Sequence, residues 1–144
     1  MQSGLPDPSY QSDFYAGVPI KRFLAWAVDE ILLLLASVLV VILTLGLAGL
    51  IFPLVYLVLS FSYRSFSLTR RSATLGMRLM ALEIRNNTGR RLASNEAFMH
   101  VGAFMVSMAF ILPMLISAVM VAASSRHQAL HDLLLGSAAI NRPR

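Results

Sequence analysis

Long apolar stretches alternate with short polar ones along this chain. Residues 31–63 carry no charged side chain. A transmembrane helix needs about 20 consecutive, mostly apolar residues, so this tract is too long for one span and short for two. Gly46 and Gly49 offer a break, which predicts two helices, over about 23–45 and about 50–66, joined by a very short turn.

A third apolar segment, predicted over about 97–123, lies in a stretch of 29 residues that is uncharged apart from a possible charge on His100. This length is long for one crossing and too short for two. Pro113 lies inside the segment, and a proline there kinks or breaks a helix. Two paths stay open. The segment crosses once, tilted or kinked, or it bends at Pro113 and re-enters, which the C-terminal arginines favour.

The segment between the second and third apolar stretches is basic. Residues 64–96 hold seven arginines, opposed by Glu83 and Glu96. Because positive charge is retained on the cytoplasmic side of membranes, we expect the loop 67–96 to be cytoplasmic. Basic side chains beside a membrane attract anionic lipid head groups. The candidates for that contact are Arg70, Arg71 and Arg78.

Short elements are predicted within and after the loop. The turn signal at residues 86–89 lies between 79–85 and 90–93, which predicts a small β-hairpin. After the third apolar segment, residues 127–135 read as a short amphipathic helix ended by a glycine. Residues 137–141 follow as a possible strand.

Composition supports a membrane protein. Hydrophobic residues make up 57% of the 144 residues, charged residues 13%, and mean hydropathy is +0.69. Soluble domains are typically about 25% charged, so a soluble enzyme, a disordered segment and a coiled coil are excluded. The net charge of +5 indicates a cytoplasmic membrane face rather than nucleic acid. Residues 1–20 lack the pattern of a signal peptide, and we expect a flexible cytoplasmic tail before a membrane domain over 21–141.

Asp29 and Glu30 are the strongest candidates for function. They lie one to two turns into the first predicted span, where ionisable side chains are costly and usually functional. Arg22 lies seven residues before Asp29, on the same face but about 10.5 Å away along the helix. A direct pair is stretched, so the partner of Asp29 is expected elsewhere. The alternative is that both carboxylates lie hydrated at the interface and set the depth of the helix.

The tail contains a second polar group. His127 and His131 are spaced i, i+4, which would place them on one helix face as weak candidates for a metal site. A third ligand is missing from the sequence nearby, so an interfacial helix with a wet face is favoured, and no cofactor is expected. Asp132 can pair with an arginine of the basic loop if the tail lies on that side. No constellation of an enzyme is present, and we expect none.

Three blocks of sequence resemble the RDD family of small bacterial membrane proteins. They are residues 15–29, 74–82 and 126–136, and the similarity extends over about 15–141. The family is named for one arginine and two aspartates, which match Arg22, Asp29 and Asp132. The resemblance implies an all-α protein of the cell inner membrane. The resemblance says less about function, although a role in transport is suggested for the family.

Two positions depart from the family pattern. Met77 stands where members often carry a lysine, and Ala138-Ala139 replaces a β-branched pair, which weakens the last predicted strand.

Two functions follow as hypotheses. In the first, the chain is part of a transport system for an ion or small solute, with Asp29 as an intramembrane carboxylate. In the second, it is a structural or accessory membrane protein in which Arg22, Asp29 and Asp132 hold helices and loop together. Three apolar segments enclose little space, so a transport path would need a homo-oligomer or a membrane partner within the bilayer. Arg22, Asp29 and Asp132 can form one polar cluster only if the tail returns to the cytoplasmic side.

Overall fold

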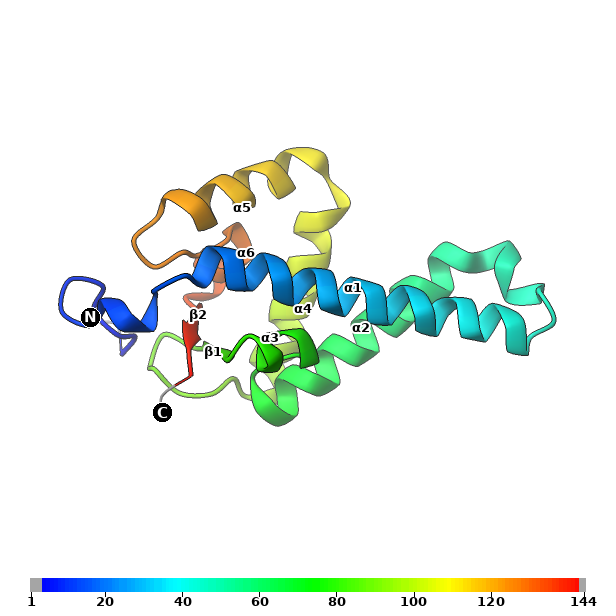
Figure 1. Ribbon diagram of the computed structural model, residues 1–144, viewed down its shortest axis with the longest axis horizontal. Coiled ribbons are helices and arrows are strands. Elements are labelled where there is room, and N and C mark those ends of the chain that lie inside the picture. The colour runs from blue at the N-terminus through cyan, green and yellow to red at the C-terminus, as the bar shows by residue number, and fades with distance from the viewer. Residues whose placement is uncertain (1–3, 143–144) are drawn as a thin grey trace.

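Two long helices form an antiparallel hairpin in the computed structural model, which describes residues 4–142. Helix α1 spans Val18–Leu43 and α2 spans Phe52–Arg71, and the short 3-10 helix η2, Leu47–Ile51, joins them. The hairpin projects beyond the rest of the molecule (Figure 1). The two predicted helices are therefore confirmed, but each extends by about five residues at its polar end.

Local sequence explains where the hairpin helices begin and end. Gly17 adopts a left-handed conformation with φ +68° just before α1, and Pro19 lies in the first turn, where no amide partner is lost. Gly46 has φ +92° in the turn after α1, a conformation that glycine adopts without steric cost. Pro53 lies in the first turn of α2.

The remaining elements gather around the end of the hairpin where α1 begins and α2 ends. We call this end the base, and the opposite end, residues 44–51, the tip. Both ends of the described chain lie at the base (Figure 1). The remaining elements are η1 (Ser12–Phe14), α3 (Leu75–Leu79), β1 (Leu82–Arg85), α4 (Ser94–Ala109), α5 (Ile111–Ala123), α6 (Leu130–Leu135) and β2 (Ala138–Asn141).

The third apolar segment is broken into α4 and α5, which meet at an angle of 113°. The break falls at Phe110, whose backbone is extended, and not at Pro113 as predicted. Pro113 lies in the first turn of α5, where a proline costs little because the amides there have no helical partner. Helix α6 then packs against both α4 and α5. The chain thus returns to the base, which is the second of the two paths left open by the sequence.

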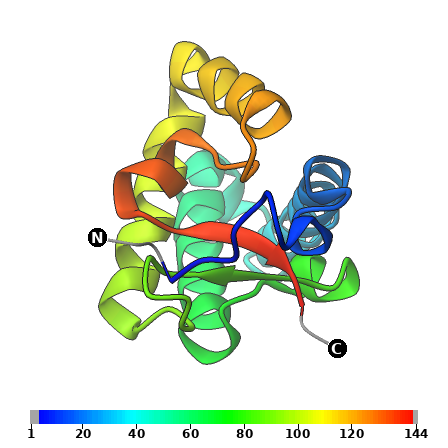
Figure 2. The same cartoon turned by 90° about the vertical axis from the view of Figure 1, so that its left-hand side faces the viewer.

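The predicted hairpin within the basic loop is wrong. Strand β1 pairs antiparallel with β2 at the other end of the chain, from Leu82 opposite Asn141 to Arg85 opposite Ala138. Figure 2 shows the two strands side by side. Residues 90–93 contribute only an isolated bridge between Arg85 and Arg91. The strand predicted over 137–141 is present as β2, and Ala138 and Ala139, the pair expected to weaken it, are fully buried.

The N-terminal segment also differs from the expectation of a flexible tail. Leu5 and Tyr15 are buried in a small apolar cluster with Ala138 and Ile140 of β2. The Asn141 side-chain amide donates hydrogen bonds to backbone carbonyls of this segment, including that of Ala16 at 2.9 Å. Burial of apolar side chains against the sheet therefore holds residues 4–17 at the base.

Apolar side chains cover the outer surface of the hairpin. Helices α1 and α2 are long and apolar enough to cross a membrane, and α4 with α5 would make a third span if counted as one. Towards the tip, Leu45 is 95% exposed and Leu50 85% exposed. A continuous apolar surface of this kind is typical of contact with lipid. The fold is compatible with an integral membrane protein.

The close approach of α3 to α1 generates the first prediction. A Cβ atom added at Gly76 would lie 2.1 Å from the carbonyl oxygen of Ala25, whereas one added at Gly102 meets no atom within 4 Å. We expect Gly76→Ala to lower the free energy of unfolding by about 3 kcal/mol. Gly102→Ala, within α4, should be neutral or stabilise by up to about 1 kcal/mol.

Denaturant titration of the detergent-solubilised variants measures both effects. Equal stability of the two variants would show that α3 does not pack on α1 in this way.

Candidate functional site

Asp29 lies buried at the junction of α1, α2 and α3. Its Oδ1 accepts hydrogen bonds from the Tyr63 hydroxyl at 2.6 Å and from the Gly76 amide at 2.9 Å. Its Oδ2 accepts one from the Thr74 hydroxyl at 2.6 Å, and the Arg64 guanidinium lies 3.8 Å away. As expected, the partners of Asp29 come from outside its own helix. Three hydrogen-bond donors satisfy both carboxylate oxygens, and the Arg64 guanidinium adds an ion pair at longer range.

The same donors organise the start of α3. The Thr74 hydroxyl caps this helix by accepting a hydrogen bond from the Met77 amide at 3.2 Å. The Tyr63 hydroxyl accepts one from the Leu75 amide at 2.9 Å. Each hydroxyl therefore donates a hydrogen bond to Asp29 and accepts one from a backbone amide of α3. The carboxylate is the centre about which the turn between α2 and α3 is built.

Glu30 is the second carboxylate of this group. It receives the Arg64 guanidinium at 2.6 Å and the Tyr56 hydroxyl, both from α2. The guanidinium carbon also lies 4.7 Å from the centre of the Phe104 ring, a cation–π contact. Arg64 is buried and serves both carboxylates. In the sequence Arg64 groups with the basic loop, and this role was not predicted, although the polar side chains on both sides of it in α2 were a weak signal.

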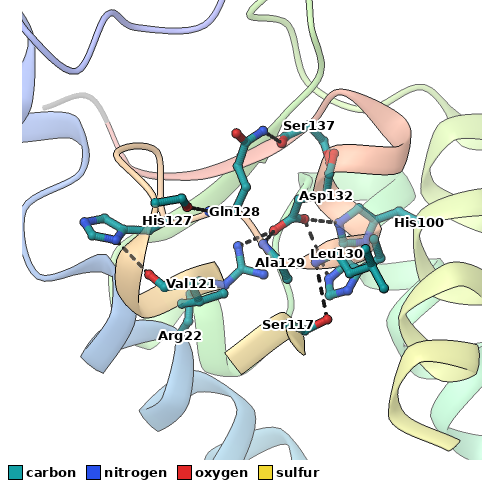
Figure 3. A network of polar contacts seen from close by, with 12 residues as sticks. Arg22, His100, Ser117, Val121, His127, Gln128, Ala129, Leu130, Asp132 and Ser137 are labelled. Carbon is teal, nitrogen blue, oxygen red and sulfur yellow. Dashed lines mark hydrogen bonds and ion pairs between the residues drawn. The ribbon is translucent and has the colours of Figure 1, made fainter. Parts of the chain in front are cut away.

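Asp132 forms the second polar group, at the start of α6 (Figure 3). It is fully buried, and its Oδ2 lies 2.7 Å from the Arg22 guanidinium and accepts the Ala129 amide at 3.0 Å. Its Oδ1 lies 2.8 Å from Nε2 of His100 and 3.7 Å from Nε2 of His131. The expected return of the tail thus brings Arg22 and Asp132 together. The partner of Asp132 comes from α1 and not from the basic loop.

Electrostatics at Asp132 favour its anion. Burial acts to raise the pKa of Asp132, but the Arg22 guanidinium and the hydrogen bond with His100 outweigh it, so the pKa lies below its ordinary value. Burial lowers the pKa of His131 to about 3, which keeps its imidazole neutral. The Arg22–Asp132 pair is therefore a charged one.

His127 and His131, which their spacing made weak metal candidates, do not share a helix face. Helix α6 begins only at Leu130, and His127 precedes it with a left-handed φ of +50°. Its Nδ1 donates to the Val121 carbonyl at 2.8 Å instead. His131 meets His100 of α4, which the linear spacing could not indicate because 31 residues separate the two.

A cavity of about 380 Å³ that is open on one side joins the two polar groups. Arg22, His100 and His131 line it from one group, and Asp29 and Arg64 from the other. The three family residues thus lie in two clusters that face one cavity, rather than in a single cluster. Most of the remaining wall is apolar, and it includes the only tryptophan of the sequence, Trp26. Arg70, Arg71 and Arg78 lie exposed at the base, away from this cavity.

The Arg22–Asp132 pair predicts a large coupling. Removing one partner leaves the other charge buried, which costs about 3–5 kcal/mol. We expect Arg22→Met and Asp132→Asn each to lower the free energy of unfolding by about that amount. The double variant should lose clearly less than the sum, with a coupling energy of about 1–3 kcal/mol. Additive losses in this cycle, measured by denaturant titration, would show that the two residues do not interact.

Comparison with known proteins places this arrangement in a family. The profile of the RDD family matches residues 16–136. No match was found among curated proteins or among solved structures. The matched range contains Arg22, Asp29 and Asp132, which anchor the two polar clusters. The chain belongs to the RDD family.

Proposed function

We propose that this chain is a multi-pass protein of the cell inner membrane that binds a small, mostly apolar solute in the cavity at the base of its helical hairpin. The observation that carries the proposal is the cavity itself. Ligand sites are typically about 300–1,000 Å³ in volume and mostly apolar, with a few placed polar groups. The cavity, at about 380 Å³, has this character.

Helix lengths support the membrane placement. At 1.5 Å per residue, the 26 residues of α1 extend over about 39 Å and the 20 residues of α2 over about 30 Å. The hydrocarbon core of a bilayer is about 30 Å thick. The hairpin is long enough to place its apolar length in lipid while the base lies at the interface.

Charge supports the orientation. The tip, residues 44–51, carries no charged side chain, whereas the arginines of the loop 67–96 lie at the base. The positive-inside rule then places the base in the cytoplasm together with the N-terminal segment. The exposed side chains of Arg70, Arg71 and Arg78 are positioned there to contact anionic lipid head groups.

The path of α4 and α5 supports a re-entrant segment rather than a third crossing. β2 pairs with β1, and Asp132 pairs with Arg22 at the start of α1. Both contacts tie the tail to the base. A single crossing by α4 and α5 would carry the tail to the opposite side and separate these partners.

The polar clusters favour a structural role for the three family residues. Both oxygens of Asp29 are already hydrogen-bonded, so an ion or proton would have to displace a protein donor. Arg22 and Asp132 neutralise one another. We infer that these residues frame the cavity and that the solute lies against its apolar wall, with one polar group towards the clusters. Transport of that solute would need a second copy of the chain or a membrane partner to complete a path.

Fluorescence of Trp26 tests solute binding. The protein in lipid nanodiscs is titrated with 4-bromobenzyl alcohol, whose bromine quenches tryptophan at short range. Wild-type protein should show saturable quenching. Ala118→Leu, which adds bulk to the cavity wall, should weaken it by roughly tenfold or more, by analogy with the loss of a good apolar contact.

Val119→Leu is the matched control, because this neighbouring side chain is 65% exposed and lies outside the cavity wall. It should behave as wild type. Quenching that rises linearly and equally in all three proteins would mean that the probe reaches Trp26 from the lipid and that the cavity binds nothing.

A further inference from the structure

We propose that His100, His131 and Asp132 form a binding site for a divalent transition metal, with Zn²⁺ the best match. One ligand atom from each residue lies within 4.8 Å of the others. The three side chains are 5%, 6% and 0% exposed. Two imidazoles and one carboxylate are a donor set of catalytic zinc sites. The proposal goes beyond solute binding and does not depend on it.

The two oxygens of Asp132 have different surroundings. Oδ2 is occupied by the Arg22 guanidinium and the Ala129 amide. Among the described residues, Oδ1 contacts the imidazoles of His100 and His131, and a metal ion there would replace its 2.8 Å hydrogen bond with His100. The first two contacts hold the carboxylate in place, and they leave one oxygen turned towards the two other candidate ligands. Hydrogen-bonded carboxylates of this kind are common around metal ligands because the partners fix their orientation.

His131 lacks the partners that a buried imidazole needs. Its Nδ1 is buried without a hydrogen bond among the described residues. Its Nε2 lies 3.7 Å from Oδ1 of Asp132, which is too far for a hydrogen bond. Buried polar atoms without a partner are rare in native proteins and call for a missing ion or water. A metal ion bound to Nε2 supplies a partner for that nitrogen, while Nδ1, which would then carry the ring proton, keeps none among the described residues.

The spacing of the ligand atoms suits a small tetrahedral ion. Zn–N and Zn–O distances of about 2.0–2.2 Å place neighbouring ligands about 3.3 Å apart. The two distances from Oδ1, 2.8 Å to His100 and 3.7 Å to His131, lie on either side of this value. The two rings are nearly perpendicular, at 89°. Shifts of about half an ångström would complete the site, with His100 carrying its proton on Nδ1.

Charge and donor type select the metal. The site offers a single carboxylate, so hard ions that depend on several anionic oxygens are disfavoured, whereas the neighbouring Arg22 opposes every cation alike. Imidazole nitrogen favours Zn²⁺ and related ions. His100 and His131 both line the cavity, so the fourth coordination position opens towards it. Water, or the polar group of a molecule in the cavity, would occupy that position.

Metal analysis tests the site directly. The protein is purified in detergent without a polyhistidine tag, dialysed against ZnCl₂ and analysed by mass spectrometry for bound zinc. Wild-type protein should retain about one Zn²⁺ per chain, and Mg²⁺ should not replace it. His100→Gln and His131→Gln should each lose binding by roughly a hundredfold in affinity.

His127→Gln is the matched control, because His127 belongs to the same tail but bonds to the Val121 carbonyl. It should retain zinc. Trp26 fluorescence and thermal unfolding check that the variants fold. Zn²⁺ should raise the unfolding temperature of wild-type protein but not of His131→Gln.

Absence of zinc from wild-type protein would overturn the proposal. Equal binding by wild-type protein and His131→Gln, or loss of zinc in His127→Gln, would also overturn it. Because the assay contains no organic solute, its outcome is separate from that of the quenching experiment.

Discussion

Burial of charge along one helix is the constraint on which the rest of this structure depends. Helix α1 carries Arg22, Asp29 and Glu30 out of water, and an unmatched buried charge costs several kcal/mol. Each is matched by a different part of the chain: Arg22 by α6, Asp29 by the turn into α3, and Glu30 by α2. The apolar hairpin forms the long axis of the molecule. The buried charges of α1 determine which other elements pack around its base.

The cavity follows from the same constraint. Two polar clusters fixed on α1, about two helical turns apart, hold α2, α3, α4 and α6 at set positions. Helix α5 returns over the space between them after the bend at Phe110. Apolar side chains line that space, so it suits a solute, while the polar groups at its edges suit recognition of one polar atom or, at His100 and His131, a metal ion.

Local pattern allowed much of this to be predicted. Hydrophobic run length predicted the two hairpin helices, the cost of an ionisable side chain in a predicted span singled out Asp29, and the C-terminal arginines favoured the return of the tail. The local pattern did not predict contacts between residues that are distant in sequence. Nothing in residues 79–93 indicates that β1 pairs with β2, because the turn signal at residues 86–89 favours a local partner and the actual one lies at the other end of the chain. Arg64 and His100 were passed over for a related reason. Arg64 was grouped with exposed arginines, and His100 stood alone in an apolar run. Only the packing of α2 and α4 brings Arg64 to Glu30 and His100 to Asp132.

The central claim is that the tail and the basic loop lie on one side of the membrane and the tip on the other. The sequence has no cysteine, so single-cysteine variants report position without background. Arg90→Cys in the loop, Ser125→Cys between α5 and α6, and Leu47→Cys at the tip are exposed positions for this purpose. An impermeant thiol reagent added to intact cells should label only Leu47→Cys, and the other two should react after the membrane is opened. Labelling of Ser125→Cys from outside while Arg90→Cys stays protected would contradict the account, because the tail could then not reach Arg22.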